Sequence, residues 1–148
     1  MLPRIEYSAT VPVSVDEAFR VFQDLSRHVR HGVCSEVSWV EGGPWQVGSR
    51  LRYLLTKPRT VLSSVVILCD PPRAVSLLHH AIGITTEEHV TFDPSRKGGT
   101  RIRMTFEFIG TSQELPESAI HEAISLLAKG ALDSVVEACQ RGRSAAGK

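Results

Sequence analysis

The sequence lacks an excess of either charge, and this limits the partners that we expect. Its 148 residues carry 17 basic and 16 acidic side chains, for a formal net charge of +1. Proteins that bind nucleic acids need a surplus of basic residues to neutralise phosphates. We therefore expect no nucleic-acid partner.

The sequence also has few cysteines and no long hydrophobic run. Cys34, Cys69 and Cys139 cannot all pair, and none belongs to a C-x-x-C motif. Unpaired thiols are typical of a reducing compartment. No apolar run approaches the roughly 18 residues of a membrane span, and residues 1–6 lack the pattern of an export signal. These absences predict a cytoplasmic protein without membrane insertion.

Several sequence motifs of common enzyme classes are missing. The chain has no G-x-S-x-G motif, no P-loop and no dinucleotide fingerprint, so nucleophile-elbow hydrolysis and nucleotide chemistry have no support. His28 and His31 have the i,i+3 spacing of two metal ligands, but the sequence shows no third ligand. We therefore predict neither a cofactor nor a bound metal.

The most regular feature that is present is an amphipathic helix, predicted over residues 116–140. Its apolar residues recur at helical spacing and share one face: Ile120, Ile124, Leu127, Ala131, Val135 and Ala138. Pro116 suits the first helical turn, and Gly142 suits a stop that leaves residues 142–148 as a frayed tail. About 25 residues give a rod roughly 38 Å long, which must bury its apolar stripe on a surface of similar length.

The rest of the chain has mainly the pattern of β-strands. Residues 4–11 alternate between apolar and polar, and Ser14 to Glu17 form a capping box for a short helix, with a second short helix at 24–30. Further strands are predicted at 37–40, 51–55, 60–69, 75–81, 85–92 and 100–109.

The order of these elements predicts an α+β fold in one domain over residues 1–148. The connections between the strands are too short for parallel crossovers, which implies an antiparallel sheet of about seven strands. A strongly curved sheet wrapped round one long helix cannot close tightly along its whole length. A cavity between the helix and the sheet is therefore expected.

Five segments in a fixed order resemble a known superfamily. They are residues 12–19 after the first strand, 42–50 with Gly42-Gly43 and Gly48-Ser49-Arg50, 70–73 (Asp-Pro-Pro-Arg), 92–102 with Phe92-Asp93-Pro94 and Gly98-Gly99-Thr100, and the closing helix. The chain resembles the START-like (SRPBCC) superfamily of polyketide cyclases and dehydrases, which has the helix-grip fold also seen in the birch-pollen allergen family. The resemblance implies a hydrophobic pocket for a lipid, polyketide or other small apolar molecule. The superfamily includes carriers, cyclases and co-chaperones, so the fold does not choose among them.

One pair of residues has the chemistry of an acid–base site. If the hairpin after residue 81 turns at Gly83-Ile84, His79 lies across from Glu88 on the face that points into the expected pocket. An imidazole and a carboxylate in a cleft suit general acid–base catalysis. Two structural interpretations stay open: a register shifted by one residue that turns His80 inward, or a polar patch at the sheet edge.

Other residues are expected to line the pocket. Alternation turns Tyr53 inward, where its hydroxyl can donate to a ligand oxygen or to a structural partner. Trp45 is interpreted either as a lid over the cavity mouth or as an anchor of its turn. The further predicted ligand-binding residues are Tyr7, Val65, Met104, Phe106, Ile124 and Leu127.

Three functions follow from these observations. The leading one is binding of a small hydrophobic ligand without chemistry, because few polar groups are expected inside. The second is a polyketide cyclase or dehydratase with His79 as base, Glu88 as orienter and Tyr53 at an enolate oxygen. The third is a protein-interaction or co-chaperone-like module, with a possible homodimer, because Leu62, Val66 and Leu68 place apolar side chains on the sheet face opposite Val61, Val65 and Ile67.

Overall fold

The computed structural model describes residues 4–56, 59–81, 83–110 and 117–146, which form one antiparallel sheet and its helices. The strands are β1 (Ile5–Val11), β2 (Cys34–Glu41), β3 (Arg50–Thr56), β4 (Arg59–Asp70), β5 (Ala74–Ala81), β6 (Ile84–Pro94) and β7 (Thr100–Gly110). The helices are α1 (Val15–Gln23), the 3₁₀ helices η1 (Leu25–His28) and η2 (Arg96–Gly98), and the long α2 (Glu117–Ala146).

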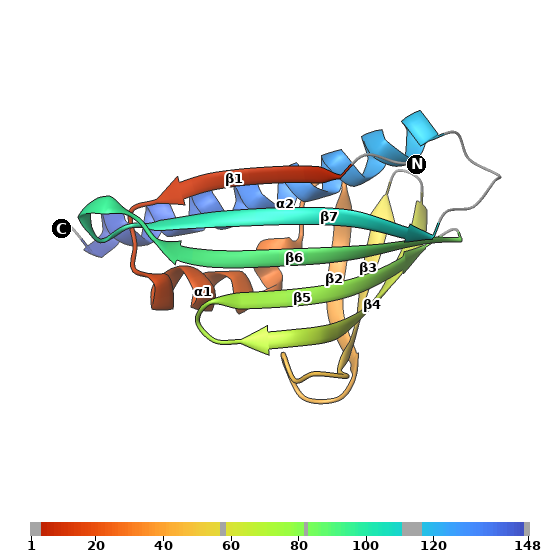
Figure 1. Ribbon diagram of the computed structural model, residues 1–148, viewed down its shortest axis with the longest axis horizontal. Coiled ribbons are helices and arrows are strands. Elements are labelled where there is room, and N and C mark those ends of the chain that lie inside the picture. The colour runs from red at the N-terminus through yellow and green to blue at the C-terminus, as the bar shows by residue number, and fades with distance from the viewer. Residues whose placement is uncertain (1–3, 57–58, 82, 111–116, 147–148) are drawn as a thin grey trace.

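The sheet has seven strands in the order β1-β7-β6-β5-β4-β3-β2, and all its pairs are antiparallel. Neighbours from β2 to β7 are consecutive in the chain, while β1 adds to the far edge beside β7. The sheet curves so strongly that β2 and β3 stand steeply across the direction of β1 and β7 (Figure 1). The predicted α+β class and helix-grip arrangement are confirmed.

Helix α2 runs along the concave side of this sheet and contacts β1, α1 and η1 (Figure 1). Two adjoining lines of its side chains face inward. The first line is buried in the core and consists of Ala128, Leu132, Val135 and Cys139. The second line, Ile124, Leu127 and Ala131, is only partly buried. This helix therefore packs on one line of residues and presents the other to the space under the sheet.

The predicted end of the long helix is wrong. We placed the stop at Gly142, but α2 continues to Ala146. Glycine in a helix costs only about 1 kcal/mol relative to alanine, and the following arginine and alanines favour helix. Pro116, the predicted first residue, lies outside the described residues.

Helix α1 begins as its sequence predicts. The Ser14 hydroxyl accepts a hydrogen bond from the Glu17 amide at 3.2 Å, which is one half of the capping box. The other half does not form as expected, because the Glu17 carboxylate binds the Arg20 guanidinium at 2.6 Å. Asp24 then caps η1 by accepting from the Ser26 amide.

The inward and outward faces of β4 are the reverse of the prediction as far as Val66, whereas Leu68, which follows a register shift, is 43% exposed as predicted. Leu62, Ser64 and Val66 are buried, whereas Val61 and Ile67 are 42% and 37% exposed. Val65 lies on the outer face with them and does not line the cavity described below. Apolar residues occur at both odd-numbered and even-numbered positions of this strand, so alternation alone could not show which set faces the core.

Candidate functional site

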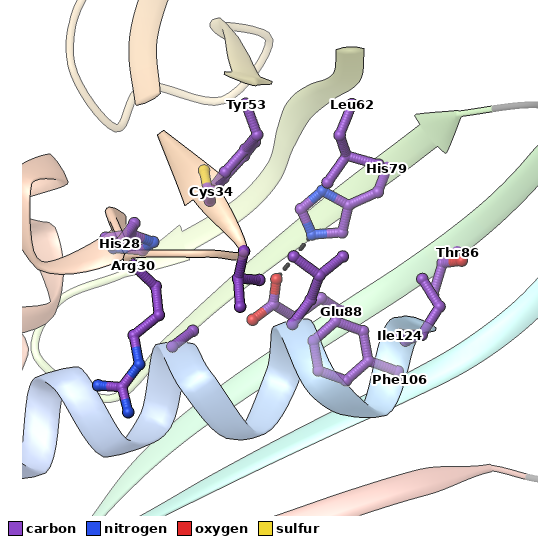
Figure 2. A pocket seen from close by; sticks show the side chains of 13 residues that line it. His28, Arg30, Cys34, Tyr53, Leu62, His79, Thr86, Glu88, Phe106 and Ile124 are labelled. Carbon is purple, nitrogen blue, oxygen red and sulfur yellow. Dashed lines mark hydrogen bonds and ion pairs between the residues drawn. The ribbon is translucent and has the colours of Figure 1, made fainter. Parts of the chain in front are cut away.

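A cavity lies where the second line of α2 faces the concave side of the sheet (Figure 2). Its lining residues are His28, Arg30, Val33, Cys34, Tyr53, Leu62, His79, Thr86, Glu88, Phe106, Ile124, Leu127 and Ala131. The cavity volume is about 50 Å³. One water molecule needs roughly 10–15 Å³, so this space holds about four waters or one small branched group.

The cavity has a closed end and an open end. The lining residues from the sheet, among them Tyr53, His79 and Phe106, are buried. Those of residues 30–33 and of α2 are only partly buried. The open end of the cavity therefore lies between residues 30–33 and α2.

His79 and Glu88 meet in the closed part of this cavity. His79 Nε2 lies 2.6 Å from Glu88 Oε1, and both side chains are buried. They are not directly opposite, because Ala81 pairs with Ile84 and His79 pairs with Thr86. The predicted register was wrong by two residues, which keeps the same sheet face and leaves Glu88 as a diagonal neighbour. His80, the alternative inward residue, is exposed and contacts Thr85.

A third residue extends this pair. Ser64 on β4 is directly opposite His79, and its hydroxyl lies 2.5 Å from His79 Nδ1. Both ring nitrogens of His79 are therefore occupied. Glu88 Oε2 has no partner among the described residues and points away from His79, toward the side of Arg30 (Figure 2). The group that a ligand can reach is thus the carboxylate, with the imidazole and the hydroxyl behind it.

Tyr53 presents a hydroxyl donor to the same space. Its ring makes an edge contact with His79, with centroids 5.7 Å apart. Burial, followed by the nearby Glu88 and Cys34, raises the pKa of Tyr53 well above its ordinary value. The phenol therefore keeps its proton at neutral pH. Within the part of the chain that the structure describes, no group accepts a hydrogen bond from this hydroxyl.

His28 is a buried lining residue that the sequence analysis did not assign to the cavity. Its Nε2 lies 2.7 Å from the carbonyl oxygen of Phe22, which can only accept, so Nε2 carries the hydrogen. Burial lowers the pKa of His28 below its ordinary value, which leaves Nδ1 as an unprotonated acceptor. His31 is exposed, so the i,i+3 spacing of these histidines does not bring them to one site.

A different group of residues on the outer sheet face could hold a metal. Glu87, His89 and Glu107 place three possible ligand atoms within 4.8 Å of one another. These side chains already have partners, since His89 contacts Ser76 at 2.8 Å and Glu107 lies 4.0 Å from Arg4. The arrangement is explained by these contacts without an ion.

The other predicted ligand-binding residues divide into two groups. Phe106, Ile124 and Leu127 line the cavity. Tyr7 and Met104 pack in the core but do not reach the lining of this cavity. The sequence analysis missed Arg30, Val33, Cys34, Leu62, Thr86 and Ala131, in addition to His28.

Trp45 anchors its turn and is not a lid over this cavity. Its indole N–H donates to the Gln23 carbonyl at 2.8 Å. The centroid of its ring lies 5.5 Å from that of Phe22 and 5.2 Å from that of Trp39. The residue is 7% exposed and is absent from the cavity lining. Of the two interpretations of Trp45, the contacts support the anchor.

Comparisons with known proteins give the same architecture. Crystal structures of the Zhui aromatase/cyclase from Streptomyces sp. R1128 and of Ara h 8.0201 are similar to this chain. The first has a TM-score of 0.80 at 17% identity and covers 99% of both chains. The second has a TM-score of 0.75 at 11% identity and covers 94% of this chain and 98% of its own. A START superfamily protein from Mycobacterium smegmatis has a TM-score of 0.73 at 8% identity, covering 92% and 96%.

These low identities show the fold alone, and none of the curated protein sequences matches the chain. No described helix is long and apolar enough to cross a membrane. The sequence profile of polyketide cyclase/dehydrase and lipid transport proteins, however, matches residues 3–141. On that match over nearly its whole length, the chain belongs to the polyketide cyclase/dehydrase and lipid transport family.

Proposed function

We propose that this protein binds a small, largely apolar molecule that carries at least one oxygen atom, in the cavity between α2 and the sheet. The observation that carries this proposal is that three polar atoms without described partners belong to residues that line one mostly apolar space. They are the hydroxyl of Tyr53, Nδ1 of His28 and Oε2 of Glu88. Apolar walls with a few converging polar groups are typical of small-molecule sites.

The cavity size limits this ligand. A cavity of about 150 Å³ accommodates benzene, whereas the space here is about 50 Å³. Only a branched aliphatic group or part of a ring therefore fits in the closed end, and the rest of the ligand extends toward residues 30–33. A multi-ring ligand requires a shift of α2 or of residues 30–33.

Binding of a neutral probe tests this proposal. We suggest 4-methylpentanamide, whose branched end fits the cavity, with the dissociation constant measured by NMR titration. Leu62→Trp fills the cavity, and Leu126→Trp adds the same side chain at a position of α2 that is 55% exposed. We expect binding to wild type and to Leu126→Trp and at least a tenfold weaker affinity for Leu62→Trp. Equal affinity in all three, or no binding to wild type, would contradict the proposal.

A larger side chain at the cavity mouth provides a second variant in case Leu62→Trp does not fold. Ala131 on α2 is partly buried and lines the open end. Ala131→Phe narrows the opening without replacing a core residue. We expect it to weaken amide binding while leaving the unfolding transition close to that of wild type.

The chain of Ser64, His79 and Glu88 supports a second candidate function, acid–base catalysis on a carbonyl compound. Glu88 Oε2 is placed to remove a proton next to a carbonyl, and Tyr53 is placed to donate a hydrogen bond to the resulting enolate oxygen. Returned to a departing hydroxyl, the same proton would complete a dehydration with loss of water. In this proposal Glu88 is the base and His79 its orienter, which reverses the roles that we gave them from the sequence.

A further inference from the structure

Arg30 differs from the other described arginines in its surroundings. Five described arginines lie within 4.0 Å of a carboxylate oxygen. Among the arginines whose side chains are described and have no such partner, all but Arg30 are exposed: Arg52, Arg59, Arg73, Arg96, Arg101 and Arg141. Arg30 is partly buried and lines the cavity. A guanidinium beside a mostly apolar cavity, with no carboxylate partner among the described residues, can bind an anionic group without breaking an existing ion pair.

The backbone of Arg30 is held in place by a tight loop. The Arg30 amide donates to the Cys34 carbonyl at 2.9 Å, and the Arg30 carbonyl accepts from the Cys34 amide at 2.8 Å. Gly32, with φ of +78°, makes the reversal between these two residues possible. Arg30 therefore starts from a fixed point at the mouth of the cavity.

The Arg30 side chain lies across α2 at Gly130, which is buried. A Cβ placed on Gly130 would lie 3.5 Å from Arg30 Cγ and 3.9 Å from Nε. The side chain thus rests directly on the helix backbone. In Figure 2 its guanidinium lies beside α2, at the end of the cavity away from Thr86 and Ile124. Among the described lining residues Glu88 is the one carboxylate; it is hydrogen-bonded to His79 through Oε1 and forms no ion pair with Arg30.

We infer that the ligand is a carboxylic acid, whose carboxylate binds the Arg30 guanidinium at the mouth while its apolar end enters the cavity toward Phe106 and Ile124. This inference rests on the proposed function and specifies the class of its ligand. A planar carboxylate matches the two parallel N–H donors of a guanidinium. The small interior and the cationic rim together fit a branched aliphatic acid of about six carbons better than a neutral lipid.

The test compares an acid with its neutral amide on the same protein. The probes are 4-methylpentanoate and 4-methylpentanamide at pH 7.5 in low salt, with both dissociation constants measured by NMR titration. Arg30→Met keeps an apolar stem over Gly130 and removes the charge, Arg30→Lys keeps the charge without the planar donors, and Arg52→Met removes an exposed charge elsewhere.

We expect wild type and Arg52→Met to bind the acid at least tenfold more tightly than the amide. In Arg30→Met the acid and the amide should bind about equally, and Arg30→Lys should show an intermediate preference for the acid. In 1 M salt the preference of wild type for the acid should shrink, while its affinity for the amide stays constant. Unchanged amide binding in the Arg30 variants shows that the cavity is intact. An acid preference that is absent in wild type, or equal in wild type and Arg30→Met, overturns the inference but leaves the proposed function standing. Failure of wild type to bind the amide overturns both.

Discussion

His79 on β5 and Glu88 on β6 share a 2.6 Å hydrogen bond although Thr86, not Glu88, is the direct cross-strand partner of His79. The contact is diagonal, and it leaves Thr86 beside the pair in the cavity wall. Because Ser64 occupies the other ring nitrogen, the imidazole has no free atom for a ligand. Any proton transfer between this pair and a bound molecule must therefore begin or end at the Glu88 carboxylate.

Replacement of Glu88 by glutamine should remove most of the proposed acid–base activity. A sensitive measure is the exchange of the α-hydrogens of a small β-diketone in deuterated buffer, followed by NMR. A positioned general base contributes about 10²- to 10⁴-fold. We expect wild type to accelerate the exchange and Glu88→Gln to lose at least 100-fold of the acceleration. Exchange that is equally fast in both proteins would remove Glu88 from any catalytic role.

The variant Ser64→Ala tests how much the hydrogen bond between Ser64 and His79 contributes to the action of Glu88 as a base. It removes the hydrogen bond to His79 Nδ1 but leaves Glu88 and its contact with His79 in place. We expect a smaller loss of exchange rate than in Glu88→Gln, because the base itself stays in place. A loss as large as that of Glu88→Gln would show that the hydroxyl itself takes part in the transfer.

Replacement of Gly130 by alanine should stabilise the protein. The new Cβ would meet Arg30 Cγ at 3.5 Å, which is an ordinary van der Waals contact, and alanine favours helix over glycine by about 1 kcal/mol. We expect the free energy of unfolding in urea to rise by up to about 1 kcal/mol. A fall in stability would mean that the Arg30 side chain cannot accept this contact.

Trp45→Phe tests whether Trp45 is an anchor of its turn. Phenylalanine keeps an aromatic ring near Phe22 and Trp39 but loses the hydrogen bond to the Gln23 carbonyl. Removing such a bond and leaving its acceptor unpaired costs about 1–3 kcal/mol. We expect lower stability in urea with unchanged affinity for 4-methylpentanamide. Weaker ligand binding at unchanged stability would instead identify Trp45 as part of the binding site.

The stability of the protein should fall in mild acid because of His28. Its pKa is lower in the folded protein than the ordinary value of 6.5. Above pH 6.5 His28 is neutral in both states. As the pH falls from 6.5 toward the folded-state pKa, the unfolded chain takes up a proton that the folded chain does not, and the free energy of unfolding decreases.

The control for this prediction is His28→Gln, whose side-chain amide can still donate to the Phe22 carbonyl but does not titrate. We expect wild type to lose more stability than His28→Gln between pH 7.5 and pH 5.0 in urea unfolding. The remaining histidines are common to both proteins, so their contributions cancel. Parallel pH dependences would contradict the assigned protonation state of His28.

Most helices and strands could be predicted from the sequence because, within each of them, the apolar residues recur at one regular spacing. Alternation along β7 and β6 found the inward faces, and the cap at Ser14 found the start of α1. The same reasoning failed for β4, where apolar residues occupy both faces and Val65 turned out to lie outside. It also misplaced the turn of the β5–β6 hairpin by one residue, which shifts the cross-strand pairing by two, since the contacts that fix the register are not local.

Three of the cavity residues that were not predicted have a different cause. His28, Arg30 and Val33 come from η1 and the short segment after it, where no periodicity assigns a direction to a side chain. The role of Gly130 was equally inaccessible, because the residue that approaches it lies 100 positions earlier in the chain. Such contacts are set by how the curved sheet brings distant segments to α2.

The most direct test of the proposed binding site is a methyl NMR titration of the isotopically labelled protein with 4-methylpentanamide. We expect chemical-shift changes at the methyl groups of Leu62, Ile124 and Leu127, which line the cavity, and none at Val47 and Leu126, which are 67% and 55% exposed. Changes confined to exposed methyl groups, or no changes at saturating ligand, would show that the space under α2 is not a binding site.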